Sequence, residues 1–161
     1  MQKYTRLQYF VILRKGLSVK MAAERLSLQV LSPEKAFFDG EVDEIVFSTP
    51  EGSIGIMNGH APMIAAVSEG VVEIIVDGES KVAAVGQGFC EIEYHRAVFY
   101  LDTAEWAEDI DVARAREALE RANHRIHNIQ SRQEYQRTQA SISRALARLK
   151  AAESGSVRNH H

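Results

Sequence analysis

The hydrophobic pattern of this chain changes its period once, at Asp109. Before Asp109, apolar residues alternate in short runs, such as LSLQVLS from Leu26 and FCEIEY from Phe89. After it, they recur at steps of three and four. A period of two is typical of β-strands, and a period near 3.6 is typical of α-helices. The sequence therefore predicts a β domain over residues 22–108 and a helical domain over residues 109–152.

Residue pairs that favour tight turns separate the runs of the β domain. Asp77 and Gly78 lie between VVEIIV and KVAAV, and an Asp-Gly pair between two apolar runs is one of the strongest hairpin signals. Asp39 and Gly40 are predicted to form a similar turn between two short strands. Many short strands separated by turn residues favour an antiparallel β-sandwich.

The helical domain is predicted to be a hairpin of two helices, because a polar stretch over residues 128–133 divides it. Much of the apolar seam is alanine or threonine, so at about 25 cal/mol per Å² of buried area it stabilises the hairpin only weakly. We therefore expect a hairpin that can open. Residues 153–161 carry no pattern and are expected to be disordered. The predicted seam residues are Val112, Ala115, Leu119, Ala122, Ile126 and Ile129, then Tyr135, Thr138, Ile142, Ala145, Leu146 and Leu149.

Charge is distributed unevenly along the chain, whose net charge is −3. Residues 22–110 include four basic and seventeen acidic residues, whereas residues 111–153 include nine basic and five acidic ones. Opposite net charges attract the two predicted domains to each other. The basic helical domain is equally suited to an acidic surface on a partner protein.

The first 21 residues hold five basic and no acidic residues. Their longest apolar run, Tyr9 to Leu13, is far shorter than the roughly 18 residues of a membrane span. No small-residue cleavage pattern of a secretory peptide follows it. We expect residues 1–21 to be an extension that is disordered or reflects an upstream start, with Met21 as the initiator; an organellar presequence is the alternative.

Residues Glu51 to Met63, EGSIGIMNGHAPM, combine turn-forming and apolar residues. Gly52, Gly55 and Gly59 permit positive φ. The apolar residues between them predict a tight turn with an apolar surface. A phosphate-binding loop is disfavoured, because neither GKS nor GKT follows. We interpret this segment as a binding surface.

The same segment resembles the glycine-rich loop of the epsilon subunit of F-type ATP synthases, which is the delta subunit in mitochondria. Two further stretches resemble that family in the same order, VGQGFCEIEYHRAVFYLDTAE from Val85 and AEDIDVARA from Ala107. The resemblance extends from Leu26 to about Ala152. Asn58 departs from it, because the family usually has proline there, which makes the turn less rigid.

The resemblance implies a sandwich of about ten strands followed by a helical hairpin, in a non-catalytic rotor subunit. Its partners would be the gamma subunit, the ring of c subunits and the alpha and beta subunits, with no nucleic acid. The hairpin would inhibit ATP hydrolysis when extended. The complex would lie on the cytoplasmic face of a bacterial plasma membrane. The implied contact with gamma and the c-ring consists of Glu51, Gly52, Ser53, Ile54, Gly55, Ile56, Met57, Asn58, Gly59 and His60.

Six arginines recur at helical spacing and permit two interpretations. They form either a solvated face, partly paired as in Glu117 with Arg121, or a site for polyphosphate, which guanidinium groups bind in a bidentate manner. The resemblance favours ATP as a regulatory ligand, with no cofactor required. The arginines are Arg114, Arg121, Arg125, Arg137, Arg144 and Arg148. The implied ATP site consists of Glu105, Ile110, Asp111, Arg114, Ala115, Arg121, Arg144 and Arg148.

Two other classes of function remain as alternatives. One is a stand-alone ATP-sensing regulatory protein, which would be stable without a gamma subunit. The other is a small enzyme, which the sequence disfavours because no acid–base pair, activated nucleophile or metal set emerges. His124 and His127 lack further ligands and are expected to be solvated, His60 is expected to stabilise a turn, and Cys90 is expected to be a buried, reduced thiol.

Overall fold

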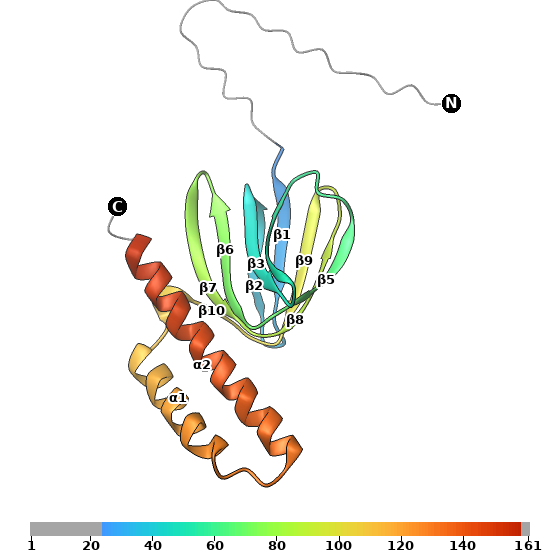
Figure 1. The fold of residues 1–161 in the computed structure, drawn as a ribbon. Helices are drawn as coiled ribbons and strands as arrows, with labels where there is room; N and C mark the ends of the chain where they lie inside the picture. The colour runs from blue at the N-terminus through green and yellow to red at the C-terminus, as the bar shows by residue number, and fades with distance from the viewer. Residues whose placement is uncertain (1–23, 159–161) are drawn as a thin grey trace, which may run out of the picture.

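The computed structural model describes residues 24–158 and consists of two stacked five-stranded sheets followed by two helices (Figure 1). Sheet A has the strand order β2-β1-β9-β8-β5, and sheet B has the order β10-β7-β6-β3-β4. The predicted sandwich of about ten strands with a C-terminal helical hairpin is confirmed. The strands are β1 (Leu26–Leu31), β2 (Ala36–Val42), β3 (Glu44–Thr49), β4 (Gly52–Met57), β5 (Met63–Val67), β6 (Gly70–Val76), β7 (Glu79–Val85), β8 (Gly88–Ile92), β9 (Arg96–Leu101) and β10 (Ala104–Trp106).

The sequence predicted antiparallel strands throughout, but one strand pair is parallel. Strands β1 and β9 pair in parallel, with Leu28 opposite Ala97. The other strand pairs among the described residues are antiparallel. Because β1 and β9 are far apart in the chain, a connection through most of the sandwich joins them, and parallel pairing needs such a long connection. Within sheet A, this parallel pair joins the β1–β2 hairpin to β9, β8 and β5.

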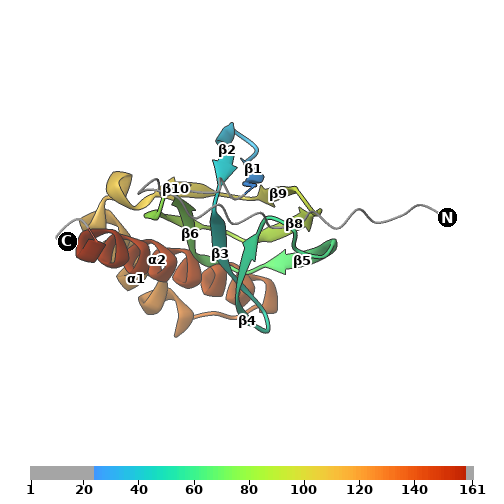
Figure 2. The same ribbon diagram turned by 90° about the horizontal axis from the view of Figure 1, so that it is seen from above.

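The helical domain covers one face of the sandwich. A short 3₁₀ helix, η1 (Ala107–Asp109), leads from β10 into α1 (Val112–Ile126), and α2 (Arg132–Arg158) returns antiparallel to α1. Helix α2 lies on β6 and β7 of sheet B, and α1 packs mainly on α2 (Figure 2). One helix therefore makes most of the contact between the two domains.

Helix α2 is longer than the sequence predicted. Residues 153–158 are helical, so the expectation of a disordered tail from Glu153 is wrong for this part. Ser154 and Gly155 are weak helix formers, and for that reason the pattern did not predict this turn. Its packing against η1 provides the missing stabilisation. The extension predicted for residues 1–21 and the last three residues of the tail lie outside the described part.

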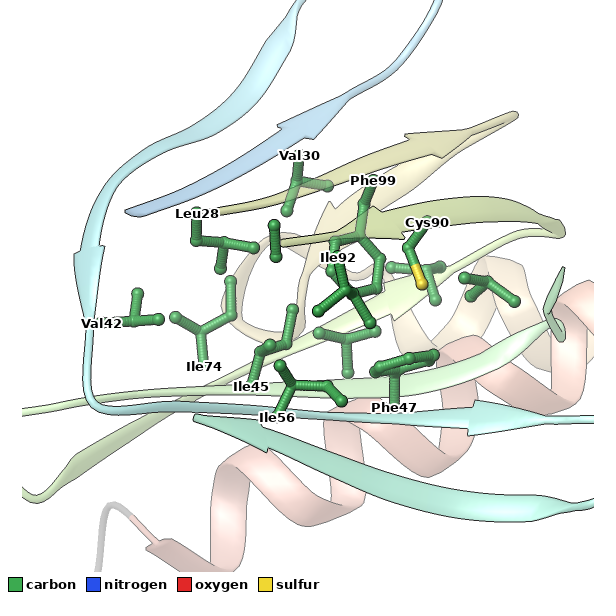
Figure 3. Packing of buried hydrophobic residues seen from close by; sticks show 14 of the residues in the cluster. Leu28, Val30, Val42, Ile45, Phe47, Ile56, Ile74, Cys90, Ile92 and Phe99 are labelled. Carbon is green, nitrogen blue, oxygen red and sulfur yellow. The ribbon is translucent and has the colours of Figure 1, made fainter. Parts of the chain in front are cut away.

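The main core lies between the two sheets and contains side chains of the sandwich alone (Figure 3). Phe47 of β3 and Phe99 of β9 meet edge to face at its centre, with ring centroids 4.9 Å apart. Cys90 and Ile92 point into this core, as the alternation of FCEIEY predicts. Tyr94 does not, because β8 ends at Ile92 and the ring is exposed. Burial raises the pKa of the Cys90 thiol to about 11, so the thiol is protonated at neutral pH.

One of the two predicted turns is confirmed and the other is wrong. Asp77 and Gly78 both have positive φ, of 54° and 80°, and join β6 to β7 in a two-residue hairpin loop. Asp39 and Gly40 instead continue β2 and pair with β1. The chain turns at Asp43, where it passes from sheet A to sheet B. The ladder to β1 therefore overrides the local turn preference of this Asp-Gly pair.

Candidate functional site

The segment Glu51 to His60 consists of the end of a turn, the strand β4 and the loop that follows it, rather than one tight turn. Pro50 and Glu51 form the turn between β3 and β4, and β4 is the edge strand of sheet B. Gly52 and Gly59 have positive φ, of 140° and 84°, so both need glycine. Gly55 does not use this freedom, because it lies within β4. The prediction of a single turn is wrong at this point.

Hydrogen bonds fasten the loop after β4 to the turn between β8 and β9. The Gly59 backbone N–H donates to the Tyr94 carbonyl at 2.6 Å. The His95 Nδ1 lies 2.9 Å from Oδ1 of Asn58 and donates to it. His60 Nδ1 lies 2.8 Å from the Ala61 carbonyl, and the bond that spans the turn at Asn58 and Gly59 is donated by the His60 backbone N–H to the Met57 carbonyl at 3.2 Å. The loop is therefore fixed in place although Asn58 is not a proline.

The implied contact residues do not share one direction. The side chain of Ile56 is completely buried in the core, so it supports β4 and is not available to a partner. Met57 is 58% exposed at the end of β4. Glu51, Gly52, Ser53, Gly55 and Gly59 are also exposed, whereas Ile54, Asn58 and His60 are partly exposed. Fewer of these ten residues are therefore accessible to a partner protein than the resemblance implied.

A larger apolar surface lies on the outer face of sheet A. Ile64 and Ala66 of β5, Phe89 of β8 and Tyr100 of β9 are exposed, and we refer to these four residues as the sheet A patch. Ala66 pairs with Phe89 and Phe89 pairs with Tyr100, so the three form one row across the sheet. The rings of Phe89 and Tyr100 stack with centroids 4.9 Å apart. Exposed apolar side chains that gather in this way mark protein interaction surfaces.

The alternation of FCEIEY places Phe89 on the side of β8 opposite to Cys90, but no sequence pattern indicated the patch. The three strands that build it are separate in the chain, and their neighbourhood follows from the sheet order β9-β8-β5. No local pattern encodes that order.

Three of the eight residues of the implied ATP site meet at the junction of the two domains. Glu105 of β10 and Arg144 and Arg148 of α2 line a hollow of about 290 Å³, which we call the junction hollow. Arg148 Nε donates to Glu105 Oε2 at 2.7 Å, and this ion pair joins α2 to the sandwich. The remaining lining residues are Ser32, Glu34, Lys35, Ala84, Val85, Asp102, Thr103, Ala104 and Ala147.

The other five residues of the implied ATP site do not line the junction hollow. They are buried, cap a helix or are exposed to solvent. Ile110 and Ala115 are buried, and the Asp111 side chain caps α1 by accepting from the Arg114 N–H at 3.0 Å. Such a cap contributes about 1 kcal/mol to a helix. Arg121 is exposed and paired with Glu117 at 3.4 Å, as the solvated interpretation predicts. The side chain of Arg114 is exposed on α1.

The sequence did not indicate Lys35 and Asp102 as lining residues of the junction hollow. They come from the connections β1–β2 and β9–β10. Lys35 lies outside the three quoted stretches that resemble the family, and Asp102 lies within the stretch from Val85 without belonging to the implied ATP site. His124 and His127 are exposed, and residues 24–158 contain no group of three His, Cys, Asp or Glu side chains that could hold a metal ion. Neither helix in this range has the length and hydrophobicity of a membrane span.

Small side chains hold α2 on sheet B. The contact cluster consists of Val82, Ala84, Ile110 and Ala151, with Val71, Ala107 and Ala152 packed against it. On the helices themselves, the buried residues include Ala115, Ala122, Thr138 and Ala145, as the predicted narrow seam requires. Tyr135 and Leu146 are 49% exposed and do not complete that seam. Each buried methyl contributes only roughly 0.8 kcal/mol, so the domain contact is weak.

Two family profiles cover most of the chain. Residues 25–107 match the family described as "ATP synthase, Delta/Epsilon chain, beta-sandwich domain". Residues 108–153 match "ATP synthase, Delta/Epsilon chain, long alpha-helix domain". The boundary between the two matches lies at η1, where the structure passes from sandwich to helices.

Curated relatives agree with these matches. The chain is 40% identical over 126 residues to the ATP synthase epsilon chain of Caldanaerobacter subterraneus subsp. tengcongensis, covering 78% of this chain and 91% of the relative. It is also 40% identical over 124 residues to that of Ruminiclostridium cellulolyticum, covering 77% and 92%.

The fold recurs in a solved chain from the mitochondrial ATP synthase of Euglena gracilis, determined with OSCP, F1 and the c-ring in rotational state 1. The TM-score is 0.71 at 18% identity, and the match covers 89% of this chain and 91% of that one. At this identity the likeness shows the fold alone. The family profiles and the curated relatives show that the chain belongs to the epsilon-chain family of ATP synthases.

Proposed function

We propose that the chain is a non-catalytic rotor subunit of an F-type ATP synthase, with the sandwich as its anchor and the helical domain as its brake. The observation that carries this proposal is the difference between the two outer faces of the sandwich. On sheet B, α2 covers β6 and β7 through small side chains. Sheet A presents large apolar side chains, with Ile64 exposed to 74% and Phe89 to 50%.

The sheet A patch is suited to a permanent protein partner. Exposed aliphatic and stacked aromatic side chains contribute strongly to binding when a partner excludes water from them. We assign this patch to the gamma subunit. The loop after β4, fixed to the β8–β9 turn, lies at one end of the sandwich and is assigned to the c-ring. In this arrangement the sandwich transmits rotation between proton transport and ATP synthesis.

The helical domain is suited to reversible docking. Alanines form much of its contact with sheet B, and the Arg148–Glu105 ion pair is partly exposed, with side-chain exposures of 42% and 34%. A partly exposed ion pair contributes about 1 kcal/mol or less. The net positive charge of residues 111–153 also matches an acidic surface on a catalytic subunit. Released from sheet B, the helices would extend along gamma and inhibit ATP hydrolysis.

Binding to the gamma subunit tests the anchor. We expect the purified full chain to bind an F1 complex depleted of its own epsilon subunit, with one copy per complex, as measured by co-sedimentation and mass spectrometry. A chain that remains stable and unbound in the presence of this complex would favour the stand-alone sensor instead.

The junction hollow supports ATP as a regulatory ligand. Two arginines of α2 and the sandwich residue Glu105 meet there, so a bound polyphosphate would contact both domains. A ligand of this kind binds the docked form better than the released form. It therefore shifts the equilibrium towards the docked form by the difference in affinity.

Replacing Arg144 by alanine tests this site. Within residues 24–158, Arg144 donates only to Ser141 Oγ of its own helix, at 3.5 Å, so Arg144→Ala leaves the Arg148–Glu105 ion pair intact. We expect ATP affinity, measured by isothermal titration calorimetry, to fall about tenfold or more, because a charge-assisted phosphate contact is lost. Arg137→Ala is the matched control, since Arg137 is exposed two turns earlier and does not line the hollow. Equal affinity of the Arg144 variant and the wild type would contradict the assignment.

Arg114→Ala tests whether the arginines of α1 bind ATP or form a solvated face. The family resemblance implies that Arg114 contacts the ligand, although its side chain is exposed away from the lining of the junction hollow. We expect reduced ATP affinity if α1 closes over the bound ligand. Unchanged affinity would show that the arginines of α1 are simply solvated.

As a subunit of such a complex, the chain would be held at the cytoplasmic face of a bacterial plasma membrane by its partners. This location follows from the proposed assembly, since the described helices do not span a membrane.

A further inference from the structure

The C-terminal end of α2 packs on the segment that connects the two domains. Helix α2 contacts η1, which lies between β10 and α1. Helices that leave the sandwich remain joined to it through this segment. The last turns of α2 therefore contact the segment that joins the helical domain to the sandwich.

Gly155 makes this contact at a distance that no other residue permits. A Cβ atom placed on Gly155 would lie 2.8 Å from the Cβ of Ala107 in η1. Two side-chain carbons do not approach so closely without displacement of one backbone. Glycine within a helix costs about 1 kcal/mol relative to alanine. Its presence near the end of α2 thus opposes helix formation and favours close packing.

Little else supports α2 at this end. A hollow of about 410 Å³ borders the contact, lined by residues that include Trp106, Val112 and Ser156 as well as Ala107 and Gly155. The buried cluster under α2 ends at Ala151 and its neighbour Ala152, one turn earlier. The Arg148–Glu105 ion pair is about two turns earlier. The space between Gly155 and Ala107 therefore sets how closely the end of α2 approaches the connecting segment.

We propose that the contact between Gly155 and Ala107 is a latch that sets how much of the protein has its helical domain docked. Gly155 lies beyond residues 108–153, which match the family's helical domain. A larger residue at position 155 pushes the end of α2 away from η1 and weakens docking. That this contact regulates the inhibition of ATP hydrolysis rests on the proposed function, but docking itself is a property of the isolated chain.

A reciprocal exchange of the two side chains tests the latch. Gly155→Ala introduces the methyl group that clashes with Ala107, and Gly155→Leu enlarges the clash. The double variant Ala107→Gly with Gly155→Ala moves the methyl group from one partner to the other and restores the space. Ser156→Ala is the matched control, because it raises helix propensity in the same turn without adding a methyl group at position 155.

Docking is measured in the full chain by electron-spin distance measurements between labels at Glu93→Cys and Gln133→Cys. Both positions are exposed, one on the sandwich and one at the start of α2. Cys90 remains unlabelled, because it is buried and its pKa is raised to about 11. Circular dichroism confirms that each variant is folded.

We expect the population at released distances to rise about tenfold in Gly155→Ala, as overpacking of a close contact predicts, and further in Gly155→Leu. The double variant and Ser156→Ala should remain within about twofold of the wild type. An unchanged population in both Gly155 variants would overturn the latch, and so would a double variant as released as Gly155→Ala. These outcomes do not depend on F1, so they are distinct from a failure of the chain to act as a rotor subunit.

Discussion

Phe89→Asp will weaken binding of the chain to epsilon-depleted F1 at least about a hundredfold, as expected when a charge replaces an aromatic anchor in a desolvated interface. Phe89 is the centre of the sheet A patch, where it pairs with Ala66 on one side and stacks on Tyr100 on the other. Its ring is half exposed in the free chain. Burial against gamma would remove water from the ring and, in the variant, from a carboxylate that has no partner.

The loss should leave the fold intact. Phe89 points away from the core, whereas its neighbours Cys90 and Ile92 are buried in it. The melting temperature of the variant is therefore expected to stay close to that of the wild type. Tyr135→Asp is the matched control, because Tyr135 is an equally exposed aromatic residue on α2. Surface plasmon resonance on immobilised F1 measures both affinities. Full binding by Phe89→Asp would exclude the sheet A patch as the gamma contact.

The elements that sequence patterns predicted correctly are encoded locally. The Asp77–Gly78 hairpin has its two strands directly adjacent in the chain, and the turn residues have the positive φ values that this loop requires. The change of period at Asp109 is also local, and Asp111 caps the helix that follows. For such features the residues that form the structure and the residues that encode it are the same.

The errors arose where distant segments decide the structure. Asp39 and Gly40 have the same turn preference as Asp77 and Gly78, but the ladder with β1 keeps them extended. The end of α2 is helical although Gly155 is a weak helix former, and it packs on η1, where Ala107 lies 48 positions earlier in the chain. Local propensity is a weak guide where such tertiary contacts compete with it.

The candidate sites also depend on contacts between distant segments, which the sequence patterns did not predict. The family resemblance indicated eight residues for an ATP site, and three of them line the junction hollow. Ile110, Asp111 and Ala115 are better explained by burial and capping in the docked form. The sheet A patch depends on which strands are neighbours, so no single stretch of sequence predicted it.

Removal of the helical domain is the second large effect that we expect. A chain that ends at Ile110 keeps every residue of the main core cluster, because these residues all lie between Leu26 and Leu101. It loses α1 and α2, and with them the contacts on Val82 and Ala84 of sheet B. The shortened chain should therefore remain folded and keep the sheet A patch. It should lose the part that we assign to inhibition.

The most direct test of this account is the rate of ATP hydrolysis by epsilon-depleted F1, measured with the full chain and with the chain that ends at Ile110. We predict that both bind with similar affinity, that the full chain lowers the rate severalfold, and that the shortened chain leaves it unchanged. Binding of both chains without inhibition by either would contradict the role of the helical domain as a brake. Failure of both chains to bind would contradict the assignment as a rotor subunit.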